Sequence, residues 1–180
     1  MAKESLTPGE VRDMMLVVAD RIIEAEPILT DADRALGDGD HGVGMERGMA
    51  AVKEALAGQD FPTVGKVLLS VGRAMMSSMG GASGALFGTL FRAGGKAVGE
   101  AAVLTGKELA LILKDGTEGV MTRGDAKPGD KTMVDALYPA AEKAGEVADL
   151  PVAEALAAIA AAAAAGRDAS EGMIATKGRA

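Results

Sequence analysis

Residues 33–45 bring together more side chains suited to chemistry than any other part of this chain. Three aspartates, the single histidine and four glycines fall within thirteen residues, in the order Asp-Arg-Ala-Leu-Gly-Asp-Gly-Asp-His-Gly-Val-Gly-Met. Carboxylate oxygens are the hard ligands that Mg²⁺ or Ca²⁺ requires, and Asp33, Asp38 and Asp40 would supply them. Glycine allows tight turns and lets backbone N–H groups approach a ligand closely.

The helical pattern that begins at Gly42 places this acidic cluster at a helix N-terminus. Unpaired N–H donors and the positive end of the helix dipole favour phosphate there. Carboxylates beside a phosphate need a cation between them, and a metal–nucleotide complex supplies one. A surface turn is the alternative, but a turn has no use for three acids packed this closely. An EF-hand loop is excluded, because the twelfth position from Asp38 is Met49 rather than Glu.

A second candidate site lies in residues 77–84, where two glycines precede Ala82 and Ser83 at a predicted helix start. Backbone N–H groups and the Ser83 hydroxyl can face one phosphate in such a turn. An ordinary Gly-Gly turn with Ser83 as the N-cap fits equally well. A nucleophile elbow is a weak alternative, because Ala85 takes the place of its last glycine. A Walker A loop is absent, since Val67 stands where Ser or Thr would bind the metal.

A third loop-to-helix junction spans residues 124–133. We predict Asp130 as the N-cap of the following helix, and Thr132 and Met133 could flank an adenine. Near the end of the chain, Lys177 and Arg179 could bring positive charge to phosphates, although an exposed basic tail explains them as well.

The composition favours closely packed helices. Hydrophobic residues make up 48% of the chain but aromatic residues only 2%, with 11 methionines and a long alanine run. The net charge of −7 and the lack of a dense basic run argue against nucleic acid and membrane surfaces as partners. The chain has no cysteine, no signal peptide and no long apolar run, so we expect a cytoplasmic protein.

Helical periodicity covers almost the whole chain, and no segment alternates apolar and polar residues as a strand does. Thr7-Pro8-Gly9-Glu10 is typical of a helix start. We expect this first helix to end at Pro27, with a connector leading to the acidic cluster, and Gly166 to break the alanine-rich helix. The further predicted helices span residues 41–57, 63–79, 82–98, 105–123, 131–147, 151–165 and 168–180.

These elements predict an all-α, up-and-down assembly with short loops. The three candidate junctions precede alternate helices of this assembly. Alternate connections of an up-and-down bundle lie at the same end, so we expect the junctions to meet at one rim.

The motifs, taken in order, resemble the nucleotide-binding L subunit of dihydroxyacetone kinase, a domain that also forms the C-terminal half of single-chain kinases. The first matching segment is Asp-x3-Gly-Asp-Gly-Asp-His-Gly at residues 33–42. The others are residues 80–88, 128–135 and 177–180, so the resemblance spans essentially the whole chain.

This resemblance implies an antiparallel helical barrel of about eight helices, with ADP or ATP and two Mg²⁺ ions at one rim. It implies that Asp33, Asp38 and Asp40 bind the metal ions. The residues that it places around the nucleotide are His41, Gly42, Val43, Gly44, Ala82, Ser83, Gly124, Met133 and Arg179.

The implied activity is phosphoryl transfer to dihydroxyacetone or a similar small ketose held by a separate K subunit, with bound ADP recharged by a phosphocarrier M subunit. A sugar-kinase L subunit that exchanges ATP at each turnover is the first alternative. A non-catalytic nucleotide-binding regulatory module is the second, and a serine hydrolase using Ser83 and His41 is a distant third. A homodimer is compatible with the sequence.

The chain departs from the family pattern in two places. Gly44 stands where the family often has Asn, so a side-chain contact to the nucleotide or metal is missing there. The family also continues past Gly-Arg-Ala, here residues 178–180, into a loop with an Asp-Pro-Gly motif and a last helix. We therefore expect one nucleotide-binding kinase domain over residues 1–180, with its C-terminal end truncated relative to the family.

Overall fold

The computed structural model describes residues 2–178, and this part of the chain forms eight α-helices and no β-strand. None of these helices is long and apolar enough to cross a lipid bilayer. In chain order the helices are α1 (Pro8–Glu24), α2 (Glu26–Arg34), α3 (His41–Leu56), α4 (Val64–Ser78), α5 (Gly81–Val98), α6 (Gly106–Gly124), α7 (Val134–Glu146) and α8 (Val152–Ser170).

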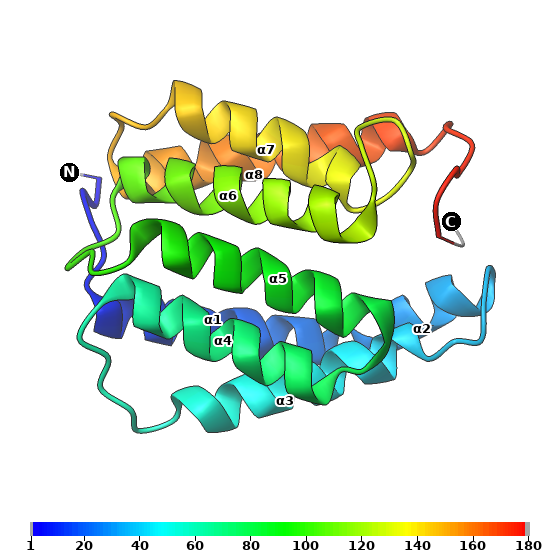
Figure 1. Ribbon diagram of the computed structural model, residues 1–180, viewed down its shortest axis with the longest axis horizontal. Helices are drawn as coiled ribbons and strands as arrows, with labels where there is room; N and C mark the ends of the chain where they lie inside the picture. The colour runs from blue at the N-terminus through cyan, green and yellow to red at the C-terminus, as the bar shows by residue number, and fades with distance from the viewer. Residues whose placement is uncertain (1, 179–180) are drawn as a thin grey trace.

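The long helices run up and down in turn, and each packs against its neighbour in the chain (Figure 1). α1 packs against α3, and the contacts then continue in order from α3 through to α8. The short helix α2 packs on α3 and reaches beyond one end of the bundle. The predicted all-α, up-and-down fold class is confirmed, and this order of contacts is consistent with a barrel.

Several predicted helix boundaries are wrong. The separate last helix predicted over residues 168–180 is not formed, because residues 168–170 end α8 and residues 171–178 are not helical. Pro27 does not lead into an irregular connector but lies in the first turn of α2, where a missing N–H is tolerated. Gly166 does not break the last helix, because α8 continues to Ser170. A side chain at Gly166 would collide with the backbone carbonyl of Asp135, so glycine here serves the close packing of α8 on α7.

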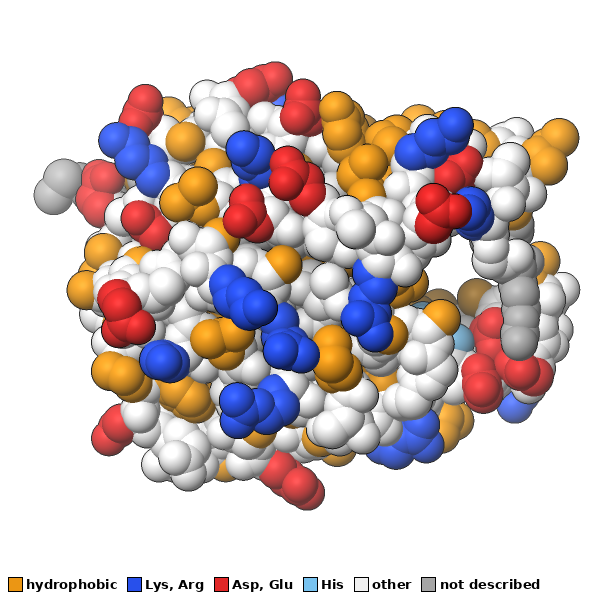
Figure 2. Space-filling view, in the orientation of Figure 1, with side chains coloured by type: hydrophobic (Ala, Val, Ile, Leu, Met, Phe, Trp, Pro, Cys, Tyr) orange, Lys and Arg blue, Asp and Glu red, His pale blue; other side chains and the backbone are white. Residues whose placement is uncertain are grey.

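The interior is built from aliphatic side chains and methionine, as the composition predicts. The largest fully buried side chains include Met49, Leu56, Met75 and Leu104. On the face seen in Figure 2, hydrophobic side chains are scattered among charged ones rather than gathered in one patch.

Glycines set the spacing between α4 and α5. A Cβ atom built on Gly65 would lie 2.7 Å from the carbonyl oxygen of Gly95, and one on Gly72 would lie 2.8 Å from that of Gly88. Real Cβ atoms do not approach backbone oxygens this closely. The two helix backbones therefore touch along their length, which small side chains alone permit.

The end of the bundle where α1, α4, α6 and α8 begin is fully capped. Thr7, Thr63 and Thr105 cap α1, α4 and α6 with their hydroxyl oxygens. The first N–H groups of α8 donate instead to the N-terminal segment, from Val152 to the Glu4 carbonyl (3.3 Å) and from Ala153 to the Lys3 carbonyl (3.2 Å). An antiparallel bridge between Leu6 and Leu104 completes this end.

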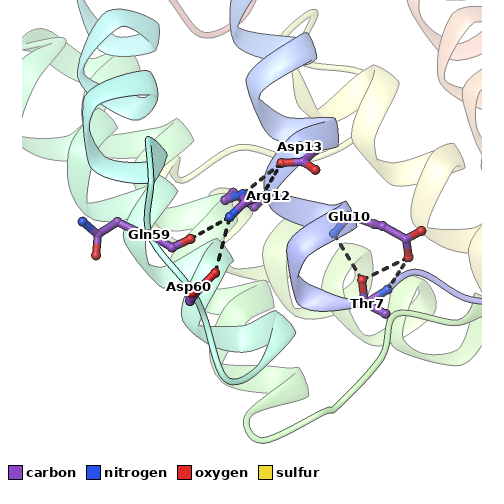
Figure 3. A network of polar contacts seen from close by, with 6 residues as sticks. All are labelled: Thr7, Glu10, Arg12, Asp13, Gln59 and Asp60. Carbon is purple, nitrogen blue, oxygen red and sulfur yellow. Dashed lines mark hydrogen bonds and ion pairs between the residues drawn. The ribbon is translucent and has the colours of Figure 1, made fainter.

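The predicted start of α1 is confirmed as a capping box. The Glu10 N–H donates to the Thr7 hydroxyl (3.3 Å), and the Thr7 N–H donates to the Glu10 carboxylate (2.9 Å), as Figure 3 shows. A hydrogen bond from Lys3 and those from Thr7 lower the pKa of Glu10 from about 4.5 to about 2. Nearby, Arg12 links α1 to the α3–α4 loop by donating to the Gln59 carbonyl (2.9 Å).

We expect Gly65→Ala to destabilise the fold by about 2 kcal/mol, because overpacking against a backbone oxygen forces α4 and α5 apart. Gly145→Ala is the matched control, since nothing lies within 4 Å of a Cβ atom on that helical glycine. This control should stabilise the protein by roughly 0.5–1 kcal/mol. Urea denaturation measures both. Equal effects of the two substitutions would contradict the close approach of α4 and α5.

We expect Glu10→Gln to lower the melting temperature at pH 7. The depressed pKa means that ionised Glu10 stabilises the fold above pH about 4.5 and loses this effect as the pH falls toward about 2. The difference between wild type and variant should therefore shrink over that range, in thermal melts followed by circular dichroism. Glu24→Gln, which removes the exposed Arg21–Glu24 pair, should have a smaller effect at pH 7.

Candidate functional site

The junctions singled out in the sequence lie together at the end opposite to the capped one. A cavity of about 700 Å³ opens there between the α2–α3 loop, the first turn of α3 and the α4–α5 turn. Figure 2 shows a hollow at this end of the molecule, with acidic side chains along one side and the histidine within it. The cavity is lined by Asp33, Gly39, Asp40, His41, Val43, Gly44, Arg47, Met79, Gly80, Gly81, Ala82, Ser83 and Gly178.

The three predicted metal ligands form one cluster. Asp33, Asp38 and Asp40 each offer a carboxylate oxygen, and these oxygens lie within 4.8 Å of one another. Asp33 is half-buried and also accepts the His41 N–H (3.3 Å), while the other two are exposed. Hard oxygens gathered this closely repel each other unless a cation lies between them, so the cluster is suited to a divalent ion such as Mg²⁺.

The first turn of α3 is held in place by α2, the helix that the sequence analysis missed. A Cβ atom on Gly42 would lie 2.7 Å from the backbone nitrogen of Thr30 and would collide with the Thr30 hydroxyl. Only glycine permits this approach. Gly44 faces the cavity with more room, because its Cβ atom would lie 3.7 Å from the Met79 carbonyl oxygen.

The start of α5 faces α3 across the same cavity. Gly80 (φ +75°) and Gly81 (φ +59°) make the turn in a left-handed conformation that favours glycine. The N-cap of α5 is Gly80, so the alternative in which Ser83 caps the helix is wrong. The Ser83 hydroxyl instead lies 3.3 Å from Nδ1 of His41.

The two helix starts at this cavity lack the side-chain caps of the opposite end. Asp40 and Gly80, the N-cap residues of α3 and α5, make no capping hydrogen bond with a side chain. Both helices thus direct N–H groups and the positive ends of their dipoles toward the acidic cluster. Such an arrangement suits an anion bound together with a cation.

Arg47 is a residue of this cavity that sequence reasoning missed. Its Nε donates to the Ser78 carbonyl (2.6 Å), and its Nη2 donates to the Met79 carbonyl. The guanidinium thereby caps the C-terminus of α4, fixes the α4–α5 turn against α3 and adds positive charge to the cavity. In the sequence it is one more charge on a predicted helix, and only the fold brings it to the turn.

A second cavity, of about 650 Å³, adjoins the first. His41, Ala82, Ser83 and Gly178 line both. Its other lining residues include the predicted Gly124 and Met133, the apolar Leu86, Phe87 and Val120, and the cationic Arg123, Lys131 and Lys177. Apolar walls beside cations suit a flat, partly polar ring such as a nucleotide base. Arg123 carries no sequence signal. Lys131 lies in the matching segment 128–135 but received no predicted role, and its backbone is left-handed (φ +57°).

The α6–α7 loop below this cavity differs from the prediction. α7 begins at Val134 rather than Lys131, and Asp130 is not its N-cap. The loop is held instead by Asp135, which accepts from the N–H groups of Gly129 (2.6 Å) and Thr132 (2.7 Å). The predicted phosphate ligand Arg179 lies outside the described residues.

The chain belongs to the DAK2 domain family, because the model of that family matches residues 35–180. It is 39% identical to the PEP-dependent dihydroxyacetone kinase, ADP-binding subunit DhaL, of Escherichia coli (strain K12), over 77% of this chain and 66% of that protein. It is 38% identical to the corresponding subunit of kinase 1 of Listeria innocua, over 67% of this chain and 60% of that protein.

The match to D-erythrulose kinase of Mycolicibacterium smegmatis is 37% identical and covers 70% of this chain but 22% of that protein. Similarity to the L subunit of dihydroxyacetone kinase is thus confirmed. The chain spans about two thirds or less of the length of each of these relatives.

The fold also matches a solved structure, the dihydroxyacetone kinase from C. freundii in complex with AMP-PNP and Mg²⁺. The TM-score is 0.65 at 24% identity, over 86% of this chain and 33% of that one. At this identity the likeness concerns the fold, and it agrees with the helical arrangement described above.

We expect Arg47→Gln to weaken binding of a phosphate-bearing ligand such as ADP about tenfold, a loss of about 1.4 kcal/mol. The variant loosens the α4–α5 turn and removes a positive charge from the cavity. Arg73→Gln is the matched control: it makes the same charge change on an exposed residue of α4 that does not line the cavity. Calorimetric titration with ADP compares them. An equal loss of ADP affinity in both variants would show that only the net charge matters, and would contradict a specific role of Arg47.

Proposed function

We propose that the chain binds ADP or ATP with Mg²⁺ at this end of the bundle and serves as the nucleotide-binding subunit of a dihydroxyacetone-type kinase. One observation carries the proposal. The acidic cluster and two helix starts without side-chain caps face one another across one cavity, whereas the helix starts at the other end are satisfied.

In this proposal Asp33, Asp38 and Asp40 hold two Mg²⁺ ions, which offset the charge of the phosphates. The N–H groups of the first turns of α3 and α5 donate to phosphate oxygens. The residues in these turns are His41, Gly42, Val43, Gly44, Ala82 and Ser83.

The neighbouring cavity takes the base and ribose, with Gly124 and Met133 in its wall. Arg179 remains a predicted phosphate ligand, and its proposed role rests on the resemblance alone.

The proposed reaction moves a phosphoryl group from the nucleotide to a hydroxyl oxygen of dihydroxyacetone or a similar small ketose. Such a transfer needs positioning and charge stabilisation more than covalent chemistry from the protein, and this cavity offers both. The ketose would be held by a separate K subunit, and bound ADP would be recharged by a phosphocarrier M subunit. Support comes from the relatives' names, which specify an ADP-binding subunit and a PEP-dependent or, in Lactococcus lactis, PTS-dependent kinase.

Two alternatives share the same site. An ATP-using kinase subunit would release ADP at each turnover, and a regulatory module would bind the nucleotide without transferring anything. Nucleotide that stays bound through gel filtration favours the phosphocarrier version, and rapid release of ADP favours exchange. A cytoplasmic location is part of the proposal, because the cysteine-free chain suits a reducing compartment. Homodimer formation stays a prediction.

The direct test is calorimetric titration with ADP in the presence and absence of Mg²⁺, with native mass spectrometry to detect nucleotide that copurifies. Tight binding that requires Mg²⁺ is the expected result. Absence of binding with Mg²⁺ present, in a sample free of copurified nucleotide, would overturn the proposal.

We expect Asp40→Asn to reduce Mg²⁺-dependent ADP affinity by about a hundredfold, or 2.7 kcal/mol, because one metal ligand loses its charge. The matched control is Asp60→Asn, which makes the same charge change on an exposed residue of the α3–α4 loop at the opposite end. Its affinity should match that of the wild type. An Asp40→Asn protein that kept Mg²⁺-dependent affinity would show that the cluster does not hold the metal.

A further inference from the structure

The segment after α8 lies at the end of the bundle that holds the two cavities. Figure 1 shows this segment beside the α6–α7 loop, at the same end as α2. Gly178 lines both cavities, and Lys177 lines the second. Residues 176–178 therefore lie at the boundary where the proposed phosphate and base positions meet.

Two aspartates of the α6–α7 region hold this segment. The Thr176 hydroxyl donates to Oδ1 of Asp130 (2.6 Å), and the Thr176 N–H donates to the Asp130 backbone carbonyl (3.2 Å). Lys177 Nζ lies 2.7 Å from Oδ2 of Asp125. These contacts join residues 46 to 52 positions apart in the chain, so they exist only in the folded protein.

The two contacts differ in strength. Asp130 is 7% exposed, and its second carboxylate oxygen accepts the Lys127 N–H (2.9 Å), so the acceptor is fixed before the segment docks. The hydrogen bond from Thr176 holds the pKa of Asp130 below its usual range, as expected for an ionised acceptor. The Lys177–Asp125 pair lies in solvent, where an ion pair contributes little.

We propose that Asp130, with a smaller contribution from Asp125, is a positioning residue that holds residues 176–178 over the two cavities and thereby slows release of the bound nucleotide. This inference rests on the proposed function and extends it to the lifetime of the complex. Neither aspartate is needed to contact the nucleotide. When the Thr176 contacts break, the segment leaves the boundary between the cavities and opens a path for release.

The test is the dissociation rate of a fluorescent ADP, methylanthraniloyl-ADP, chased with excess ADP in a stopped-flow instrument with Mg²⁺ present. Thr176→Val keeps the size of the side chain but removes the hydroxyl donor, and we expect dissociation to become roughly tenfold faster. Asp125→Asn should accelerate it only about twofold, because that pair is exposed. Thr176→Ser keeps the donor and should release ADP at the wild-type rate.

Asp149→Asn is the matched control. It removes the exposed Lys107–Asp149 pair (3.3 Å) at the opposite end and should leave the dissociation rate unchanged. Amide hydrogen exchange of the nucleotide-free proteins gives an independent readout. The backbone amide of residue 176 should exchange faster in Thr176→Val than in the wild type, with equal exchange in the core of α4.

The outcomes separate this inference from the proposed function. Faster release and faster exchange at residue 176, both restored by Thr176→Ser, support the positioning role. Unchanged release in a Thr176→Val protein that binds ADP would overturn it and leave the nucleotide-binding function standing. A wild-type protein that binds no ADP would overturn both.

Discussion

The close approach of helix backbones is the constraint on which the rest of this structure depends. With almost no aromatic residues, the chain cannot fill wide gaps between helices, so its helices must lie close together. Glycines at the contacts make this possible, and Gly65 and Gly72 bring α4 against the backbone of α5. Because α4 and α5 pack against each other along their length, the turn that joins them is held between their ends, and with it one wall of the site.

The same constraint acts at the acidic cluster through Gly42. The first turn of α3 lies directly on α2, so the loop between these helices must fold back over a short distance. That loop carries Asp38 and Asp40, and α2 carries Asp33. A larger residue at position 42 would separate α2 from α3 and increase the distances between the carboxylates of Asp33, Asp38 and Asp40. The geometry of the proposed metal site therefore depends on the close packing of α2 on α3.

One end of the bundle is built for stability, and the other has the features of a binding site. One end is closed by three threonine caps, two of them capping boxes, and by the N-terminal segment, which bind helix N–H groups within the protein. At the other end, α3 and α5 begin without side-chain caps and face carboxylates. Helix starts without side-chain caps and clustered acids are both less stable in the absence of a ligand. Their concentration at one end is the physical reason to assign binding there, with the docked segment of residues 176–178 acting on the same end.

The sequence by itself determined the helical class and the position of the acidic cluster, because hydrophobic periodicity and residue chemistry are local properties. It also determined that the three junctions share one end, since short loops force consecutive helices to be antiparallel. The resemblance to a kinase subunit rested on the same local motifs, and the match to the DAK2 domain family and to the DhaL relatives confirmed it. The roles of the individual site residues stay predictions. Most of those within the described residues line the two cavities, while Asp38 joins them through the carboxylate cluster and Gly42 is buried in the first turn of α3.

Only the tertiary structure decided where contacts between residues distant in the chain override local helix propensities and capping patterns. Gly166 is a helix breaker by propensity, but the close packing of α8 on α7 keeps it inside a helix, whereas Pro27 is accommodated in the first turn of a helix that the sequence pattern did not indicate. Asp130 looks like an N-cap, yet its carboxylate holds Thr176, which lies 46 residues away. Arg47 has no local signal at all, and it reaches the α4–α5 turn only once α3 and α4 have packed. Each of these outcomes depends on long-range contacts, which a local sequence pattern does not encode.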